Sequence, residues 1–289
     1  MPFPSGGGVD AVARIAMQPL ATSLGQQIVF DNRGGSSGII ATELAARAAP
    51  DGYTLFFGVT SALAILPHYH RQLPYDVMKD FAPINLIAAA AYVLVVHPSQ
   101  QAASVKELIA LAKQKPGALN YASAGNGTTL HLTTELFRSM AGIDIVHVPY
   151  KGAAAALTDL VSGQIHLAFI PPAVVVPQMR SARLRGLAVT SAKRFALLPE
   201  LPTIAEAGLP GYESVGWYGV LAPARTPAAV VTRLHRELLK AIGEREVRER
   251  FAANGIEARG TTPEQFAAYL RDEYAKWGKV ARAAGVKAD

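Results

Sequence analysis

Two glycine-rich loops carry the residue types in this chain that are best suited to binding an anion. The first is residues 5–8, Ser-Gly-Gly-Gly, directly before a helical pattern that begins near Val9. Glycine lets a ligand approach the backbone closely, and the free amides at the start of a helix point at an anion with the helix dipole behind them. The loop is not a P-loop, because no Gly-Lys-Ser/Thr follows it. It is either an anion site or a plain turn.

The second loop, residues 123–128, reads Ser-Ala-Gly-Asn-Gly-Thr and leads into a helix that is expected from Thr128. Its amides, together with the hydroxyls of Ser123, Thr128 and Thr129, are suited to holding a carboxylate. The alternative is a tight turn followed by an N-capped helix. The third glycine of the dinucleotide-binding fingerprint is missing. Two loops of similar design favour binding over simple turns.

Residue patterns for catalysis or for a bound metal are weak. Ser123 with His131 as its base would suit a hydrolase, but no third group is apparent to orient the imidazole. His68 and His70 share one face of an extended segment, and no third metal ligand accompanies them. The chain has no cysteine, which excludes a thiol nucleophile, a thiolate zinc site and a disulfide scaffold. We therefore expect no enzyme activity, no metal and no cofactor.

The elements that must position these loops are short apolar runs that alternate with helical patterns. This alternation predicts an α/β fold with parallel sheets and right-handed crossovers. The expected strands are residues 27–30, 53–58, 84–96 (one or two strands), 119–122, 145–148, 165–169, 184–190 and 216–222. The expected helices are residues 9–24, a helix that ends at 48, and 104–114, 128–141, 153–162, 173–181, 227–242, 244–254 and 263–284.

Local signals refine several of these helices. Pro19 should kink or split the first one. Ser104 and Glu107 form a capping box, in which each side chain satisfies an amide near the other. Thr226 and Thr262 each precede a proline, which predicts an N-cap followed by proline at the first helical position.

Composition narrows the class of protein. The 289 residues carry a net charge of +6, and half of them are hydrophobic. The longest apolar run, residues 86–96, is shorter than the roughly 20 residues that span a membrane. The mixed charges of residues 245–250 are typical of a solvated helix face rather than a nucleic-acid patch. The first residues lack the charged and apolar regions of a signal peptide. The mild basic bias favours an anionic small ligand.

Separated motifs along essentially the whole chain, in order, resemble the Bug receptors, which are the substrate-binding proteins of tripartite tricarboxylate transporters. The motifs are residues 2–10 (PFPSGGGVD), 31–35 (DNRGG), 49–55 (APDGYTL), 73–76 (LPYD), 120–127 (NYASAGNG), 147–152 (HVPYKG), 187–191 (LAVTS) and 199–208.

The resemblance implies a type II periplasmic-binding-protein fold, in which two lobes close on a small organic carboxylate in a cleft between them. Each lobe is expected to hold a mainly parallel sheet flanked by helices. Residues 1–98 and 220–289 would form the first lobe, and residues 99–219 the second. The resemblance also implies a periplasmic monomer that delivers its ligand to the membrane permease subunits of a tripartite transporter. A ligand-sensing protein of the same fold, without a transport role, is the alternative.

The resemblance also implies ligand contacts from four parts of the chain. They are Phe3, Gly7, Gly8 and Asp10 in the first loop, Thr60 and Ser61 after an expected strand, Ser123, Ala124, Thr128, His131 and Tyr150 in the second lobe, and Ile170 and Pro171.

Departures from the family pattern bear on the choice of ligand. Ile170 and Pro171 stand where the family commonly has Asp-Asn, which predicts a more apolar distal pocket and argues against an amino-acid ligand. Gly34 and Leu66 replace a usual proline and asparagine. The signal peptide and apolar strand that precede the first motif in the family are expected to be missing here.

Overall fold

The computed structural model describes residues 1–35, 38–70, 72–150 and 152–285. Ser36 and Ser37, which follow the second motif, and Lys151 of the sixth motif lie outside the described residues. The described chain divides into two units. Unit 1 comprises Met1–Ala89 and Trp217–Ala281, and unit 2 comprises Ala90–Gly216 and Arg282–Gly285. The lobe boundaries expected from the sequence at 98/99 and 219/220 stay a prediction.

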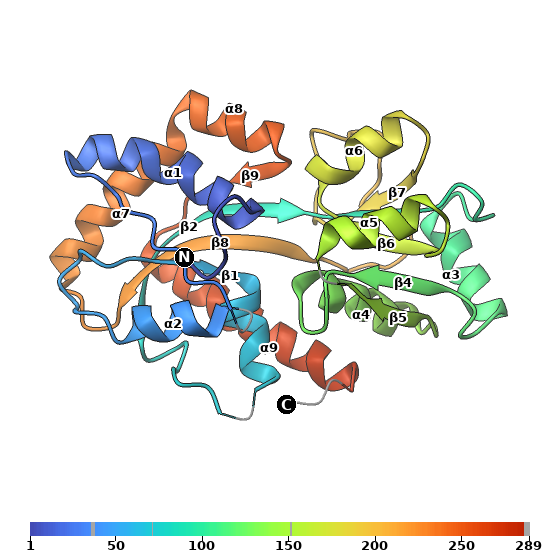
Figure 1. Ribbon diagram of the computed structural model, residues 1–289, viewed down its shortest axis with the longest axis horizontal. Helices are drawn as coiled ribbons and strands as arrows, with labels where there is room; N and C mark the ends of the chain where they lie inside the picture. The colour runs from blue at the N-terminus through green and yellow to red at the C-terminus, as the bar shows by residue number, and fades with distance from the viewer. Residues whose placement is uncertain (36–37, 71, 151, 286–289) are drawn as a thin grey trace. The chain divides into compact units, whose positions relative to one another are not determined.

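Unit 1 is built on a four-stranded sheet in the order β1-β8-β2-β9. β1 is antiparallel to β8. Figure 1 shows α1, α7 and α8 on one side of this sheet and α2 and α9 on the other. The strands are β1 (Phe56–Val59), β2 (Phe81–Ala91), β8 (Val215–Pro223) and β9 (Ile256–Ala258). The helices are α1 (Gly8–Leu24), α2 (Ile39–Ala46), α7 (Ala228–Gly243), α8 (Arg245–Ala253) and α9 (Pro263–Ala283).

Helix α1 follows the first glycine loop and continues through Pro19 as one helix, so the expected split does not occur. One face of the helix, including Ala16 and Leu20 on either side of the proline, is buried. Packing of that face opposes the break that proline favours. Gly25 ends the helix in the left-handed conformation, with a φ of 64°.

Two expectations for unit 1 are wrong. Residues 27–30 form no strand, and Val29 is 86% exposed. Apolar alternation makes a strand only where a partner strand pairs with it, and none does so among the described residues. Thr226 does not cap α7, because that helix begins one residue later, after Pro227. Ala229, three residues after Thr226, has no polar side chain to complete a capping box.

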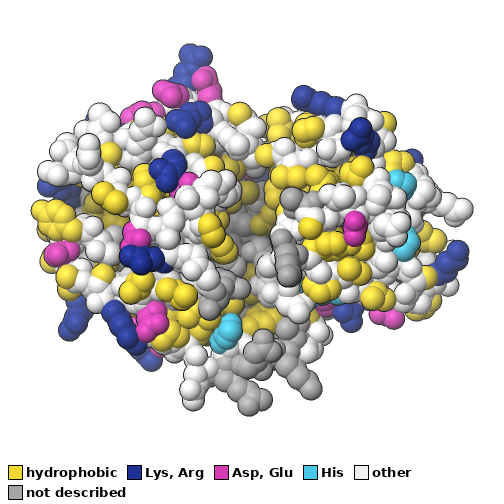
Figure 2. All heavy atoms as spheres, viewed as in Figure 1, with side chains coloured by type: hydrophobic (Ala, Val, Ile, Leu, Met, Phe, Trp, Pro, Cys, Tyr) yellow, Lys and Arg dark blue, Asp and Glu magenta, His cyan; other side chains and the backbone are white. Residues whose placement is uncertain are grey.

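The second expected cap in unit 1 is present. Thr262 Oγ1 accepts from the Gln265 amide at 3.2 Å, and Gln265 Oε1 accepts from the Thr262 amide at 2.9 Å. This reciprocal capping box starts α9. The charged helix α8 is also as expected. Arg245 pairs with Glu249 at 2.6 Å, and Figure 2 shows basic and acidic side chains next to one another over this helix.

Unit 2 is built on a five-stranded sheet in the order β5-β4-β6-β3-β7. β4 is parallel to β5 and β6, whereas β3 is antiparallel to β6 and β7, so this sheet is mixed. The strands are β3 (Val93–Val96), β4 (Asn120–Ser123), β5 (Val146–Pro149), β6 (Leu167–Ile170) and β7 (Arg185–Val189). The helices are α3 (Val105–Gln114), α4 (Thr129–Ala141), α5 (Ala153–Val161) and α6 (Pro172–Arg180).

Alternate strand residues of unit 2 enter two separate cores. Tyr121 and Phe169 pack with residues of α3 and α4. Ala122 and Ile170, one position further along the same strands, pack with residues of α5 and α6. Because strand side chains alternate between faces, each helix pair covers one face of the sheet. The α/β fold class predicted from the sequence is confirmed.

The capping box of unit 2 is also confirmed. Ser104 Oγ accepts from the Glu107 amide at 3.2 Å, and Glu107 Oε2 accepts from the amide of Ala103 at 2.7 Å. In the part of the chain that the structure describes, no helix is long and apolar enough to cross a membrane.

Candidate functional site

The parallel strands of unit 2 end together at one edge of the sheet. Ser123, the last residue of β4, is in register with Pro149, the last residue of β5. The neighbouring strand β6 ends at Ile170. Carboxyl ends of parallel strands are favoured ligand positions in α/β sheets. The structure therefore brings the loop after Ser123 close to the segment of Tyr150.

The loop after β4 is shaped by hydrogen bonds to its own groups. Thr128 Oγ1 donates to the carbonyl of Gly125 at 2.8 Å and accepts from the His131 amide at 3.4 Å. Gly125 has a φ of 128°, a conformation that residues with a Cβ rarely adopt. A Cβ on Gly125 would lie 3.3 Å from the carbonyl oxygen of Tyr150. The two strand-end loops are thus in direct contact.

Ser123 is paired with a histidine that the sequence analysis did not single out. Its Oγ lies 2.6 Å from Nε2 of His147, and the Ser123 residue is 1% exposed. His131 makes a different contact, because its Nδ1 accepts from the amide of Gly127 at 3.2 Å. Ser123 is therefore paired with His147 and not with His131, the base that the hydrolase alternative would use. The register between β4 and β5 places His147 beside Ser123, and this register cannot be read from one sequence.

The two histidine rings of this site stack on each other. Their centroids are 4.0 Å apart, and the Tyr121 ring lies 4.8 Å from that of His147 and 6.4 Å from that of His131. Burial lowers the pKa of His131 to about 4, with a smaller contribution from Arg138. Burial and then His131 lower the pKa of His147 to about 4. Both imidazoles are therefore neutral at pH 7.

Tyr150 and Ile170 are less available to a ligand than the sequence suggests. The Tyr150 hydroxyl donates to Asp159 of α5 at 2.7 Å. Burial first, and then the Asp159 carboxylate, raises the pKa of Tyr150 to about 12. Ile170 is 1% exposed within the core on the α5 and α6 face, while Pro171 is partly exposed. Ligand contacts by these residues stay a prediction.

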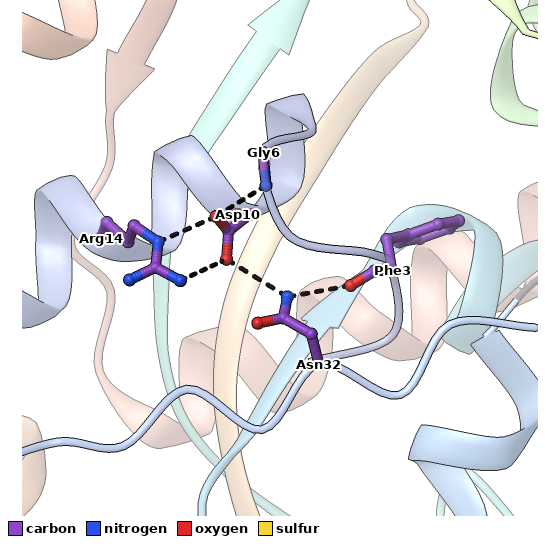
Figure 3. Close-up of polar contacts among 5 residues, drawn as sticks. All are labelled: Phe3, Gly6, Asp10, Arg14 and Asn32. Atoms are coloured by element: carbon purple, nitrogen blue, oxygen red, sulfur yellow. Dashed lines mark hydrogen bonds and ion pairs between the residues drawn. The ribbon is translucent and has the colours of Figure 1, made fainter.

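In unit 1, Asp10 organises the first glycine loop from inside (Figure 3). Its carboxylate accepts from the Gly6 amide at 3.0 Å, from Arg14 Nε at 2.8 Å and from Asn32 Nδ2 at 3.2 Å. The Arg14 hydrogen bonds first, and the Gly6 amide next, hold the pKa of Asp10 at about 2. This buried carboxylate is ionised and already paired. It braces the loop and is not suited to receiving a second carboxylate.

The other residues of this loop do not take part in the hydrogen bonds of Asp10 through their side chains. Figure 3 shows the ring of Phe3 pointing away from Asp10, with only its carbonyl accepting from Asn32, at 2.9 Å. Gly7 and Gly8 are exposed, and no side chain caps the start of α1. The first amides of that helix are therefore the groups with capacity for an anion.

The turn after β1 lies against the same loop. A Cβ on Gly38 would lie 3.0 Å from Pro2 Cβ and 3.4 Å from Ala62 Cβ, so these three segments meet. Thr60 is buried, and its hydroxyl accepts from the Trp217 amide at 2.8 Å. Ser61 is partly exposed at the start of a π-helical turn, Ser61–Ile65. Of these two predicted residues Ser61 is the more exposed, and ligand contact by either stays a prediction.

His68, one of the other two histidines noted in the sequence, packs against α9. His68 Nε2 lies 2.8 Å from the carbonyl oxygen of Tyr274 in α9, and the ring approaches Gly278. No group of three potential metal ligands occurs among residues 1–35, 38–70, 72–150 and 152–285.

A fold of this kind, with glycine loops at helix starts in both units, is that of the solute-binding receptors. A model of the family described as "Tripartite tricarboxylate transporter family receptor" matches residues 12–286. Protein BugT of Bordetella pertussis is 36% identical over 288 residues, which cover 99% of this chain and 88% of BugT. The chain belongs to this receptor family, and the resemblance to Bug receptors is confirmed.

Solved structures agree with this assignment. The R. palustris protein Rpa4515 with adipate has a TM-score of 0.86 and 40% identity, covering 98% of this chain and 95% of that one. MatC from Rhodopseudomonas palustris with bound malate has a TM-score of 0.81 and 29% identity, covering 96% of each chain. The family consists of solute-binding receptors.

Proposed function

We propose that this chain is a receptor for a small dicarboxylate, with one anion-binding loop in each unit. The observation that carries the proposal is the pair of helix starts, α1 and α4, each preceded by a glycine loop with exposed or partly exposed backbone. The adipate and malate bound by its structural relatives have one carboxylate at each end, which suits two such loops. Each carboxylate would accept hydrogen bonds from first-turn amides.

Recognition in this proposal depends on dipoles rather than on ion pairs. Arg14, the basic side chain that Figure 3 shows beside the first loop, is already paired with Asp10. A carboxylate therefore meets backbone amides, which satisfy its oxygens without a neutralising cation. A ligand that contacts both units stabilises the arrangement in which both loops reach it, so binding is coupled to closure.

The cellular role follows from the family. We place the receptor in the periplasm, where it delivers its ligand to the membrane permease subunits of a tripartite tricarboxylate transporter. It acts as a binding protein, and no bond of the ligand is made or broken.

Isothermal titration calorimetry tests the proposal with adipate and malate as probes. Neutral 1,6-hexanediol and cationic 1,6-diaminohexane are controls that match adipate in carbon number. We expect saturable one-site binding of at least one dicarboxylate and none of either control. The proposal fails if neither dicarboxylate binds and a wider panel of small organic acids also leaves the melting temperature unchanged, or if hexanediol binds as tightly as adipate.

A further inference from the structure

The loop of residues 123–128 rests on two stacked imidazoles that hold it at both ends. Near its start, Ser123 Oγ lies 2.6 Å from His147 Nε2. Near its end, the Gly127 amide donates to His131 Nδ1 at 3.2 Å. The rings stack with centroids 4.0 Å apart and an interplanar angle of 12°. A movement of either ring would therefore displace one end of the loop.

Counting protons identifies which nitrogen of each ring acts as an acceptor. A backbone amide can only donate, so His131 Nδ1 must be unprotonated. Ser123 has one hydroxyl proton and two neighbouring acceptors, His147 Nε2 and the Gly125 carbonyl at 3.1 Å. That carbonyl already accepts from Thr128 Oγ1 at 2.8 Å and from the Thr128 amide at 3.3 Å. Its two lone pairs are thus used, which assigns the Ser123 proton to His147.

We propose that His131 and His147 are positioning residues that clamp the ligand loop through acceptor nitrogens, and that the Ser123 hydroxyl is an internal strut rather than a ligand donor. Ser123 in turn accepts from the Gly125 amide at 3.1 Å, which fixes the glycine at the bend of the loop. With the serine proton used internally, the carboxylate is recognised by backbone amides. This inference rests on the proposed function for its link to binding, but the clamp itself does not.

The clamp requires both rings to be neutral. The titratable groups that face them are Tyr121 on β4 and Glu135 and Arg138 on α4. Tyr121 donates to Glu135 at 2.5 Å, and Arg138 pairs with Glu135 at 2.9 Å, so this carboxylate is already occupied. A proton on His131 Nδ1 would oppose the Gly127 amide. Because folding lowers the pKa of each histidine from 6.5 to about 4, the stability contributed by the neutral rings is complete above pH 6.5. It is lost as the pH falls through about 4.

Nitrogen-15 NMR of the imidazoles at pH 7 tests the proton assignment directly. We expect His131 as the Nε2–H tautomer and His147 as the Nδ1–H tautomer, which is an opposite pair within one stack. The assignment is overturned if His147 carries its proton on Nε2, or if either ring is doubly protonated at this pH.

Matched substitutions test the clamp. His147→Gln and His131→Asn each keep an acceptor near the nitrogen they replace, whereas His147→Leu and His131→Leu remove it. We expect each leucine variant to bind adipate about tenfold more weakly, and each amide variant to stay within about threefold of the original chain. Amide hydrogen exchange should accelerate at Gly125 in His147→Leu and at Gly127 in His131→Leu, and much less in the amide variants.

The two readouts separate the inference from the proposed function. If the original chain does not bind adipate, the proposed ligand class is in question, while the NMR and exchange results still decide the clamp. If adipate binds and the leucine variants match the original chain in affinity and in exchange, the clamp is wrong. Equal losses in the leucine and amide variants would show that ring packing, and not the acceptor nitrogen, positions the loop.

Discussion

Replacing Gly125 with valine should lower dicarboxylate affinity by about 100-fold or more while leaving the fold intact. Gly125 has a φ of 128°, and a Cβ there would lie 3.3 Å from the Tyr150 carbonyl oxygen. A β-branched side chain cannot adopt this φ or fit beside this oxygen unless the backbone moves, and the local strain costs about 1–3 kcal/mol. The loop would then lose the arrangement of amides that faces the ligand. Calorimetric titration with adipate measures the loss.

Gly142 provides the matched control for this substitution. Helix α4 starts directly after the loop of residues 123–128, and Gly142 lies at its other end. Gly142 also has a positive φ, of 59°. A Cβ at Gly142 would meet no atom within 4 Å. Gly142→Val should therefore destabilise the chain by about 1–2 kcal/mol and leave adipate affinity unchanged. Equal affinity losses in the two variants, or none in Gly125→Val, would contradict a ligand site at residues 123–128.

Replacing Glu273 with leucine should lower the free energy of unfolding by about 3 kcal/mol. Glu273 is 5% exposed, and its Oε2 accepts from the indole N–H groups of Trp217 at 3.1 Å and Trp277 at 2.8 Å. Lys276 donates to its other oxygen. Leucine would fill the space and leave two buried N–H groups without an acceptor. Glu273→Gln keeps an acceptor oxygen, so we expect it to lower the free energy of unfolding by only about 1 kcal/mol.

Urea unfolding followed by tryptophan fluorescence suits this test, because Trp217 and Trp277 are the only tryptophans of the chain. The signal therefore reports unit 1 at the cluster that is altered. Glu246 on α8 has an 81% exposed side chain and serves as the control. Glu246→Leu should change the free energy of unfolding by less than about 0.5 kcal/mol. A Glu273→Leu variant as stable as this control would show that the carboxylate does not hold the two indoles.

Much of the candidate binding region could be predicted from the sequence because strand ends and glycine loops are local signals. Parallel strands align their carboxyl ends, so the predicted strands place the loop after Ser123 and the segment of Tyr150 at the same end of the sheet. The pairing of Ser123 with His147 could not be predicted, since it depends on the register between β4 and β5. Once Tyr121 is known to be opposite His147, the stack follows from strand geometry.

In the first loop, the spacing of two side chains on a helix is the local signal, and ligand contact by Asp10 stays a prediction. Asp10 and Arg14 are four residues apart on a helix, a spacing that predicts an ion pair. The family resemblance instead suggested Asp10 as a ligand contact, whereas the structure shows its carboxylate bracing the loop. The strand predicted at residues 27–30 was wrong for another reason. Strand propensity depends on a pairing partner, and propensity alone does not supply one.

A crystal structure of the chain with adipate would show whether both glycine loops hold the ligand. We expect one carboxylate within hydrogen-bond distance of the first amides of α1 and the other within hydrogen-bond distance of the amides of residues 124–130, with the Ser123 hydroxyl still bonded to His147. Density for adipate in some other part of the molecule, or a carboxylate held by lysine or arginine side chains away from both loops, would contradict it.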